Sequence, residues 1–183
     1  MTEPIRWSEA SIISALAVAF EWWRRDLCPN VQEGSEMDMA LLTKAGLLWE
    51  IEIKISMADW KADLKKERRY NPGWSPARFY YAVPAALVAN GIPEWAPAHA
   101  GVLRLRNELQ HHTEPNGRRV IGHGPRSAGW LRQAKILHKV KAPPFVREAL
   151  RAKIYARYWR HVAPQITATA PATIEVPHLA ETP

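Results

Sequence analysis

The chain has 183 residues, 47% of them hydrophobic, which suits one folded domain of ordinary size and argues against wholesale disorder. Its formal net charge is +7, and residues 101–163 carry fourteen Lys or Arg against three Glu, which leaves the rest of the chain acidic. This basic half indicates a polyanionic partner, of which nucleic acid is the expected one. A solvated basic helix without a partner would give the same composition.

The sequence also bears on the cellular compartment. A single cysteine, Cys28, excludes an internal disulfide and fits a reducing environment. The apolar stretch Ile12–Phe20 is too short to span a bilayer. It is also a poor signal peptide, because Glu3 and Glu9 dilute the positive charge expected before it. We therefore expect a cytoplasmic protein with no membrane association.

The first elements expected along the chain are a helix and a β-hairpin. Helical spacing of apolar residues predicts a helix over Glu9–Arg25, after which Pro29 and Asn30 interrupt the pattern. Two alternating segments then predict paired strands at Glu36–Leu42 and Leu47–Ile55. The short polar connection between them, which ends in glycine, is typical of a hairpin loop.

A helix capped by Ser56 is expected next, with Asp59 completing the cap, Trp60 and Leu64 in the core and Asp63 bordering the polar strand face. The later elements follow from apolar runs and from proline and glycine breaks. They are a strand at Ala77–Val83, a short helix at Ala85–Ala89, a strand at Gly101–Arg106, a surface loop at Asn107–Ala128, and helices at Gly129–Val140 and Phe145–Val162, while the helix capped by Ser56 should end at about Arg68.

This order of elements predicts an α/β protein with a mixed central sheet flanked by helices. We expect a core over residues 1–108, a basic loop and helical C-terminal extension over residues 109–162, and a loosely held tail rich in Ala, Thr and Pro over residues 163–183.

The register of the hairpin is the most informative inference. If Gly46 takes the left-handed position of a three-residue loop, paired residue numbers sum to 90, and Met37, Met39, Leu41, Trp49, Ile51 and Ile53 share one apolar face. On the other face Asp38 lies opposite Glu52, with Lys54 two residues further along. A slip of one residue would mix the two faces, so the pattern itself selects this register.

Two carboxylates opposite each other in a ladder repel unless something compensates. A divalent cation between Asp38 and Glu52 would do so, since two hard oxygen ligands completed by water are an ordinary Mg²⁺ site. A solvent-facing strand with a simple charge ladder is the alternative that geometry alone leaves open.

These residues also carry a resemblance. The hydrophobic strand around Asp38, the series Trp49-Glu50-Ile51-Glu52-Ile53-Lys54-Ile55-Ser56, and the aromatic strand Arg78–Pro84 together resemble the core of the PD-(D/E)XK nuclease superfamily. More narrowly, they are similar to bacterial DNA-repair proteins of the MmcB type. The resemblance covers about half of the chain, and Met37 stands where the superfamily motif has proline.

The resemblance implies a restriction-endonuclease-like fold and a metal-dependent nuclease. Asp38 and Glu52, with the carbonyl of Ile53, would bind one Mg²⁺ or Mn²⁺. Lys54 would orient a water molecule or stabilise charge that develops on the phosphate. Glu21 on the first helix is the candidate for a further acidic catalytic group, and a solvated residue near Arg24 and Arg25 is its alternative role.

We therefore expect hydrolysis of DNA phosphodiester bonds, in repair or in phage and mobile-element DNA processing. One alternative is a non-catalytic DNA-binding module on the same fold, and a second is a small structural or adaptor protein whose basic tail helix binds a protein partner. A homodimer is compatible with this chemistry, because one active centre cuts one strand at a time, and no further cofactor is expected. The residues expected to contact phosphate are Lys65, Lys66, Arg118, Arg119, Arg151 and Lys153.

Overall fold

The structure is a computed structural model that describes residues 6–20, 26–32, 36–66, 72–106, 110–113, 117, 119–122 and 128–169. Side chains are not described for residues 110–112, 120–122 and 157–169. The helical elements are α1 (Glu9–Ala19), α2 (Met57–Asp63), the 3₁₀ helix η2 (Ala85–Val88) and α3 (Pro144–Thr169). The strands are β1 (Asp26–Val31), β2 (Met37–Leu42), β3 (Leu48–Ile53), β4 (Arg78–Pro84), β5 (Gly101–Leu105), β6 (Gln110–Thr113), β7 (Arg119–Gly122) and β8 (Ala128–Arg132).

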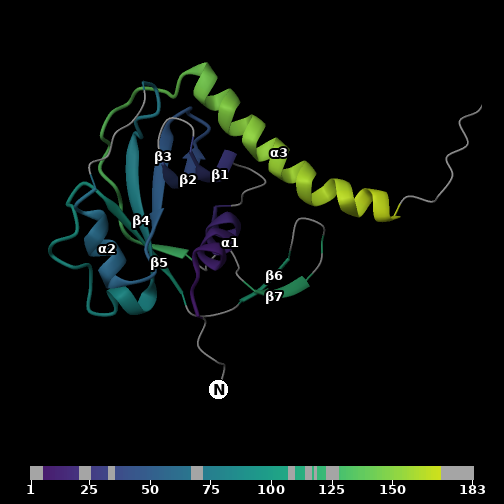
Figure 1. Cartoon of the computed structure of the whole chain (residues 1–183). Helices are drawn as coiled ribbons and strands as arrows, with labels where there is room; N and C mark the ends of the chain where they lie inside the picture. The colour runs from purple at the N-terminus through teal and green to yellow at the C-terminus, as the bar shows by residue number, and fades with distance from the viewer. Residues whose placement is uncertain are drawn as a thin grey trace, which may run out of the picture.

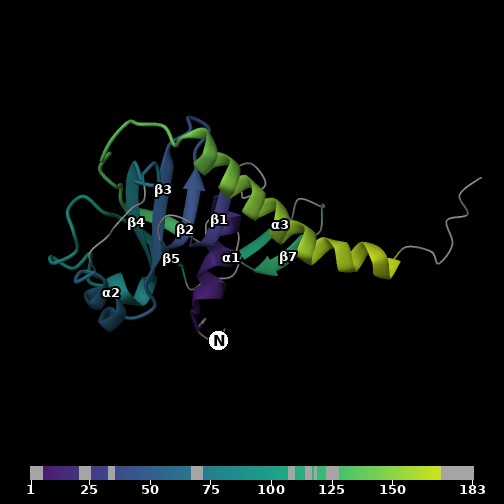
Figure 2. The same cartoon turned by 45° about the horizontal axis from the view of Figure 1, so that its top comes forward.

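Six strands form one mixed sheet in the order β1-β2-β3-β4-β5-β8 (Figure 1). The central strands β3, β4 and β5 are parallel, and the flanking pairs are antiparallel. The expected α/β class with a mixed central sheet flanked by helices is therefore confirmed. Strands β6 and β7 form a separate two-stranded sheet (Figures 1 and 2). None of the described helices is both long and apolar enough to cross a membrane.

Helices cover both faces of the large sheet. On one face Ile12 and Leu16 of α1, with Phe20 at its C-terminal cap, pack against apolar residues of β2, β3, β4 and β5. On the other face two clusters lie side by side. Val146 and Leu150 of α3 cover β1, β2 and the start of β3, while Trp60 of α2 covers β4 and β5. We call the apolar residues around Trp60 the α2 cluster and those around Val146 and Leu150 the α3 cluster. The second face of β3 beyond Leu48 therefore lies between these two clusters.

The hairpin has the predicted register near its loop, but the observed ladder ends at Met39–Ile51 and does not reach the expected pairs Asp38–Glu52 and Met37–Ile53. The pairs Met39–Ile51, Ala40–Glu50, Leu41–Trp49 and Leu42–Leu48 all sum to 90. Gly46 has the expected positive φ of 82°, and the loop is closed by the Thr43 amide, which donates to the Leu47 carbonyl at 3.0 Å. The apolar face expected for this hairpin is confirmed for Met39, Leu41, Trp49, Ile51 and Ile53, which all contact the cluster under α1.

Met37 departs from that face, because it packs with the α3 cluster on the opposite side of the sheet. A missed strand explains the departure. β1 includes Pro29 and Asn30, where only a break in the helical pattern was predicted, and it pairs with β2. Asn30 would face Asp38, but it is skipped in the register and has a positive φ of 48°. The regular alternation of both strands therefore breaks at Asn30 and Asp38.

The remaining expectations are confirmed in part. β4, η2 and β5 lie where strands and a short helix were predicted, and α3 begins one residue earlier than expected and continues to Thr169. The helix expected after Ser56 does start there but ends at Asp63, not at Arg68, and Leu64 is 39% exposed rather than part of the core. The loop expected over Asn107–Ala128 contains β6 and β7. The first helix ends at Ala19, and Glu21–Arg25 lie outside the described residues.

The helix predicted over Gly129–Val140 is wrong. Residues 128–132 form β8, the edge strand beside β5, and residues 133–143 continue as an extended segment. Backbone amides of this segment donate to distant carbonyls rather than along a helix: Lys135 to His99, Leu137 to Ala77, and Ala142 to Gly46. Tertiary hydrogen bonds thus override the local helical spacing of its apolar residues.

Candidate active site at the end of β3

Three charged residues of β3 and the segment after it lie on the second face of the sheet and are buried. Glu50 is 0% exposed, and Glu52 and Lys54 are each 3% exposed. Their alternation places them on one side of the strand, in the space between the α2 and α3 clusters. The polar face of the hairpin, for which a solvated charge ladder was the alternative, is therefore an enclosed charged cluster.

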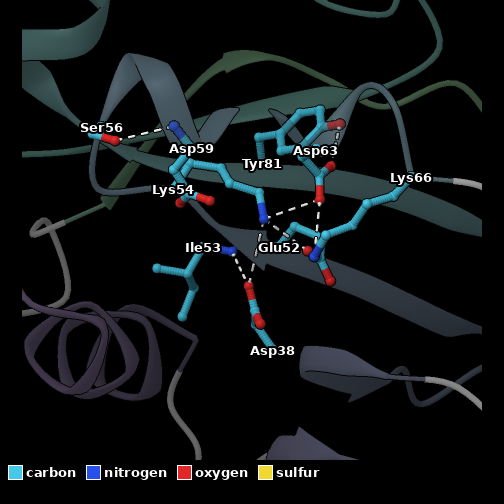
Figure 3. A network of polar contacts seen from close by, with 9 residues as sticks. All are labelled: Asp38, Glu52, Ile53, Lys54, Ser56, Asp59, Asp63, Lys66 and Tyr81. Carbon is cyan, nitrogen blue, oxygen red and sulfur yellow. Dashed lines mark hydrogen bonds and ion pairs between the residues drawn. The ribbon is translucent and has the colours of Figure 1, made fainter. Parts of the chain in front are cut away.

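Lys54 lies at the centre of this cluster (Figure 3). Its Nζ is 2.9 Å from Glu52 Oε2 and 3.1 Å from Asp63 Oδ1, and 4.0 Å from Asp38 Oδ2. The three carboxylates come from three elements, β2, β3 and α2. A buried ammonium requires such partners, because an uncompensated charge away from water is costly.

Asp38 lies where the hairpin ladder opens. Hydrogen-bonded pairs alternate along an antiparallel ladder, so after Thr43–Leu47 the positions 41/49, 39/51 and 37/53 should exchange backbone bonds. The observed pairing ends at Met39–Ile51, and the Ile53 amide instead donates to Asp38 Oδ2 at 2.7 Å. Asp38 thus replaces a backbone carbonyl as the acceptor.

The same pairing rule orients the Ile53 carbonyl. Within a strand the amide and carbonyl of one residue point to the same neighbour. The Lys54 amide donates to the Ala82 carbonyl on the β4 side, so Ile53 directs both its groups toward β2 and Asp38. The carbonyl that the resemblance assigns as a ligand therefore lies on the side of the strand that carries Asp38.

Asp63 and Tyr81 are parts of this cluster that sequence reasoning underrated. The Tyr81 hydroxyl donates to Asp63 Oδ2 at 2.9 Å, and the Asp63 side chain is 0% exposed (Figure 3). A signal was present in the sequence. Asp63 is three residues after Trp60, so the two share one helix face, and a buried Trp60 implies a buried Asp63.

The cluster changes the proton affinities of two of its members. Burial and the charge of Glu52 raise the pKa of Asp38 from 3.8 to about 6, against the Ile53 hydrogen bond and Lys54, which lower it. Burial alone would lower the pKa of Lys54, but the carboxylates of Glu52 and Asp63 outweigh it and hold that pKa above its ordinary value of 10.5. Lys54 therefore stays charged at neutral pH, while the pKa of Asp38 is about 6.

These residues fit a hard divalent cation. One ammonium is surrounded by three carboxylates, so the cluster carries excess negative charge when Asp38 is ionised. Among the described residues no group of three or more His, Cys, Asp or Glu side chains is arranged to hold a metal. A cation bound here would have Asp38, Glu52 and the Ile53 carbonyl as protein ligands, as the resemblance implies, and water would complete the shell, as is common for Mg²⁺.

The other predicted residues lie on several elements. Lys65 and Lys66 follow α2 and are exposed, and Lys66 Nζ is 3.8 Å from Asp63 Oδ1. Arg119 is exposed on β7, while Arg151 and Lys153 lie on α3. Arg151 Nε donates to Asp26 Oδ2 at 2.9 Å.

The candidates Glu21 and Arg118 lie outside the described residues. The first helix nevertheless brings an acidic group toward the site. The charge of Glu9, in the first turn of α1, contributes to the raised pKa of Asp38.

Comparisons with known proteins give a fold relation. No protein-family model matches the chain. No curated protein matches it either. Among solved structures, a protein of unknown function from Silicibacter pomeroyi is similar to this chain, with a TM-score of 0.53 and 20% sequence identity over 94% of this chain and 99% of that one. At this identity the likeness shows a shared fold and no activity.

Proposed function

We propose that the protein is a metal-dependent nuclease that hydrolyses DNA phosphodiester bonds, built on a restriction-endonuclease-like core with a basic helical C-terminal extension. The observation that carries the proposal is the Asp38, Glu52 and Lys54 cluster, in which a buried ammonium lies within 4.0 Å of both carboxylates. Burying this much charge opposes folding, and catalysis is a reason to retain it.

Each residue has a role in this proposal. Asp38 and Glu52, with the Ile53 carbonyl, hold the metal ion. Bound there, Mg²⁺ or Mn²⁺ would neutralise charge on the scissile phosphate and lower the pKa of a water molecule. Lys54 keeps its proton at neutral pH, so it acts as a fixed positive charge that stabilises the developing negative charge rather than as a base.

Basic residues outside the cluster supply affinity for the DNA backbone without reading sequence. Lys65 and Lys66 follow the helix that carries Asp63, so they are placed to hold phosphates close to the reacting one. Arg119, Arg151 and Lys153 extend the positive surface to β7 and α3. DNA repair or the processing of phage and mobile-element DNA are the settings that we propose for this activity.

The test is cleavage of end-labelled single- and double-stranded DNA with Mg²⁺ or Mn²⁺. We expect cleavage that EDTA abolishes and that Asp38→Ala and Lys54→Ala eliminate. Asp59→Ala is the matched control, because this carboxylate is on α2 but exposed, and it should cut like the wild type.

Two results would contradict the proposal. Binding of DNA without cleavage under either metal would favour the non-catalytic DNA-binding module. Cleavage that survives both site variants would place the activity elsewhere or in a contaminant.

A further inference from the structure

Asp63 is the carboxylate beside Lys54 to which the proposed reaction assigns no role. It is held from two sides, by Tyr81 and by Lys54. Its side chain is 0% exposed, while that of Asp38 is 31% exposed, and the Tyr81 hydroxyl donates to its Oδ2 at 2.9 Å. Its other oxygen, Oδ1, is directed at Lys54 (Figure 3).

The proposed metal ligands create a conflict that Asp63 resolves. Glu52 Oε2 is 2.9 Å from Lys54 Nζ, so a metal ion bound by Glu52 would draw on a carboxylate that already pairs with the ammonium. A cation that recruits Glu52 would weaken the closest ion pair of a lysine whose side chain is 4% exposed, at a large cost in free energy. Asp63 Oδ1 is 3.1 Å from the same nitrogen and comes from a different element, so it can remain the partner of Lys54.

We propose that Asp63 is a positioning residue for the metal centre: it retains the Lys54 ammonium, supported by Tyr81, while Glu52 turns to a divalent cation. The inference rests on the proposed function. Asp63 then contacts neither metal nor phosphate and acts through Lys54. The adjacent cation Lys66 does not substitute for Lys54 as its partner, because its side chain is 63% exposed and its Nζ is 3.8 Å away.

The test measures Mn²⁺ affinity by titration calorimetry without DNA, in a cycle of wild type, Asp63→Asn, Lys54→Gln and the double variant. In the wild-type background Asp63→Asn should weaken Mn²⁺ binding by about tenfold, because Lys54 then holds Glu52. In the Lys54→Gln background, where no ammonium competes for Glu52, the same change should alter the affinity by less than about threefold.

Two controls separate this role from a general loss of charge or of structure. Asp63→Glu retains the carboxylate and should recover most of the affinity. Asp59→Asn removes an exposed negative charge from the same helix and should leave Mn²⁺ binding unchanged. If Asp63→Asn does not fold, as judged by circular dichroism, Tyr81→Phe replaces it in the cycle and should weaken binding only when Lys54 is present.

The outcomes are distinct. An equal loss of affinity in both backgrounds, or no loss in either, would overturn the role of Asp63 while leaving the nuclease proposal intact. A wild-type protein that binds no Mn²⁺ and cuts no DNA would overturn both.

Discussion

At the scale of single residues, the described part of the protein places four charged side chains where water is largely excluded. Glu50, Glu52, Lys54 and Asp63 are each 3% exposed or less. Such groups are tolerated when each finds a partner, and removing one partner costs more than the pair contributes. The spacing of Glu52 and Lys54 along a strand could be predicted from the sequence. Their burial could not, because it depends on which helices cover that face.

Removal of the central ammonium should destabilise the fold. Lys54→Met leaves Glu52 and Asp63 buried without it, so we expect the free energy of unfolding at pH 7 to fall by about 3 kcal/mol. Urea denaturation measures this loss, with Lys65→Met, an exposed lysine, as the control. A loss no larger than that of Lys65→Met would contradict the assignment.

Asp38 should make the folded protein less stable as pH rises, which is the opposite of the usual effect of a carboxylate whose pKa falls on folding. Its pKa rises from 3.8 to about 6 on folding, so the folded state binds its proton more tightly than the unfolded state. The stability from this proton is fully present below about pH 4 and is lost as pH rises through about 6. Relative to Asp38→Asn, the wild type should therefore lose stability over this interval. Parallel stability curves for the two proteins would refute the raised pKa.

At the scale of elements, local signals succeed where the chain can satisfy its hydrogen bonds locally. The hairpin register follows from alternation and from the positive φ that Gly46 adopts, and both are properties of adjacent residues. The error over Gly129–Val140 has the opposite cause. Backbone amides of residues 135–142 donate hydrogen bonds to the carbonyls of His99, Ala77 and Gly46. A local sequence pattern cannot predict partners this far away along the chain.

Gly101 marks where this extended segment meets the sheet. A Cβ on Gly101 would overlap the Tyr80 ring and lie 2.7 Å from the Ala134 nitrogen. Gly101→Ala should therefore lower the free energy of unfolding by about 3 kcal/mol, which thermal or urea denaturation would measure. Gly129→Ala, in the adjacent strand β8, is the matched control. Its nearest contact would be Arg106 Nη2 at 3.9 Å, so its effect should stay within about 0.5 kcal/mol. Similar effects of the two variants would contradict the close approach.

At the scale of the whole molecule, the helices on the second face of the sheet determine whether the polar side chains of β3 are buried or exposed. α3 covers β1 and β2 and α2 covers β4, which leaves Glu50 and Glu52 enclosed between them. α3 then continues past the edge of the sheet (Figures 1 and 2). Its first half packs through Val146 and Leu150 while the Arg151 side chain remains 62% exposed, so this helix can present basic groups to a polyanion.

Those basic groups should contribute to DNA binding in a way that salt reveals. The combined variant Arg119→Ala, Arg151→Ala and Lys153→Ala should weaken binding to all DNA sequences alike. It should also reduce the slope of log K against log salt by roughly one for each phosphate that the variant no longer neutralises. The Arg151–Asp26 ion pair is largely exposed, so its removal should cost no more than about 1 kcal/mol of stability. Lys44→Ala in the hairpin loop is the control, and an equal effect there would indicate binding by net charge alone.

Sequence patterns were sufficient to predict the hairpin, its register next to the loop, the capped helix start at Ser56 and the shared face of Glu52 and Lys54, because these depend on neighbours along the chain. The tertiary structure was needed to establish that this polar face is buried, that Asp63 and Tyr81 join it, and that residues 128–132 become an edge strand. The physical reason is that burial and the sharing of a buried charge are properties of surfaces brought together from distant parts of the chain. A local pattern specifies which residues share a face but not what covers it.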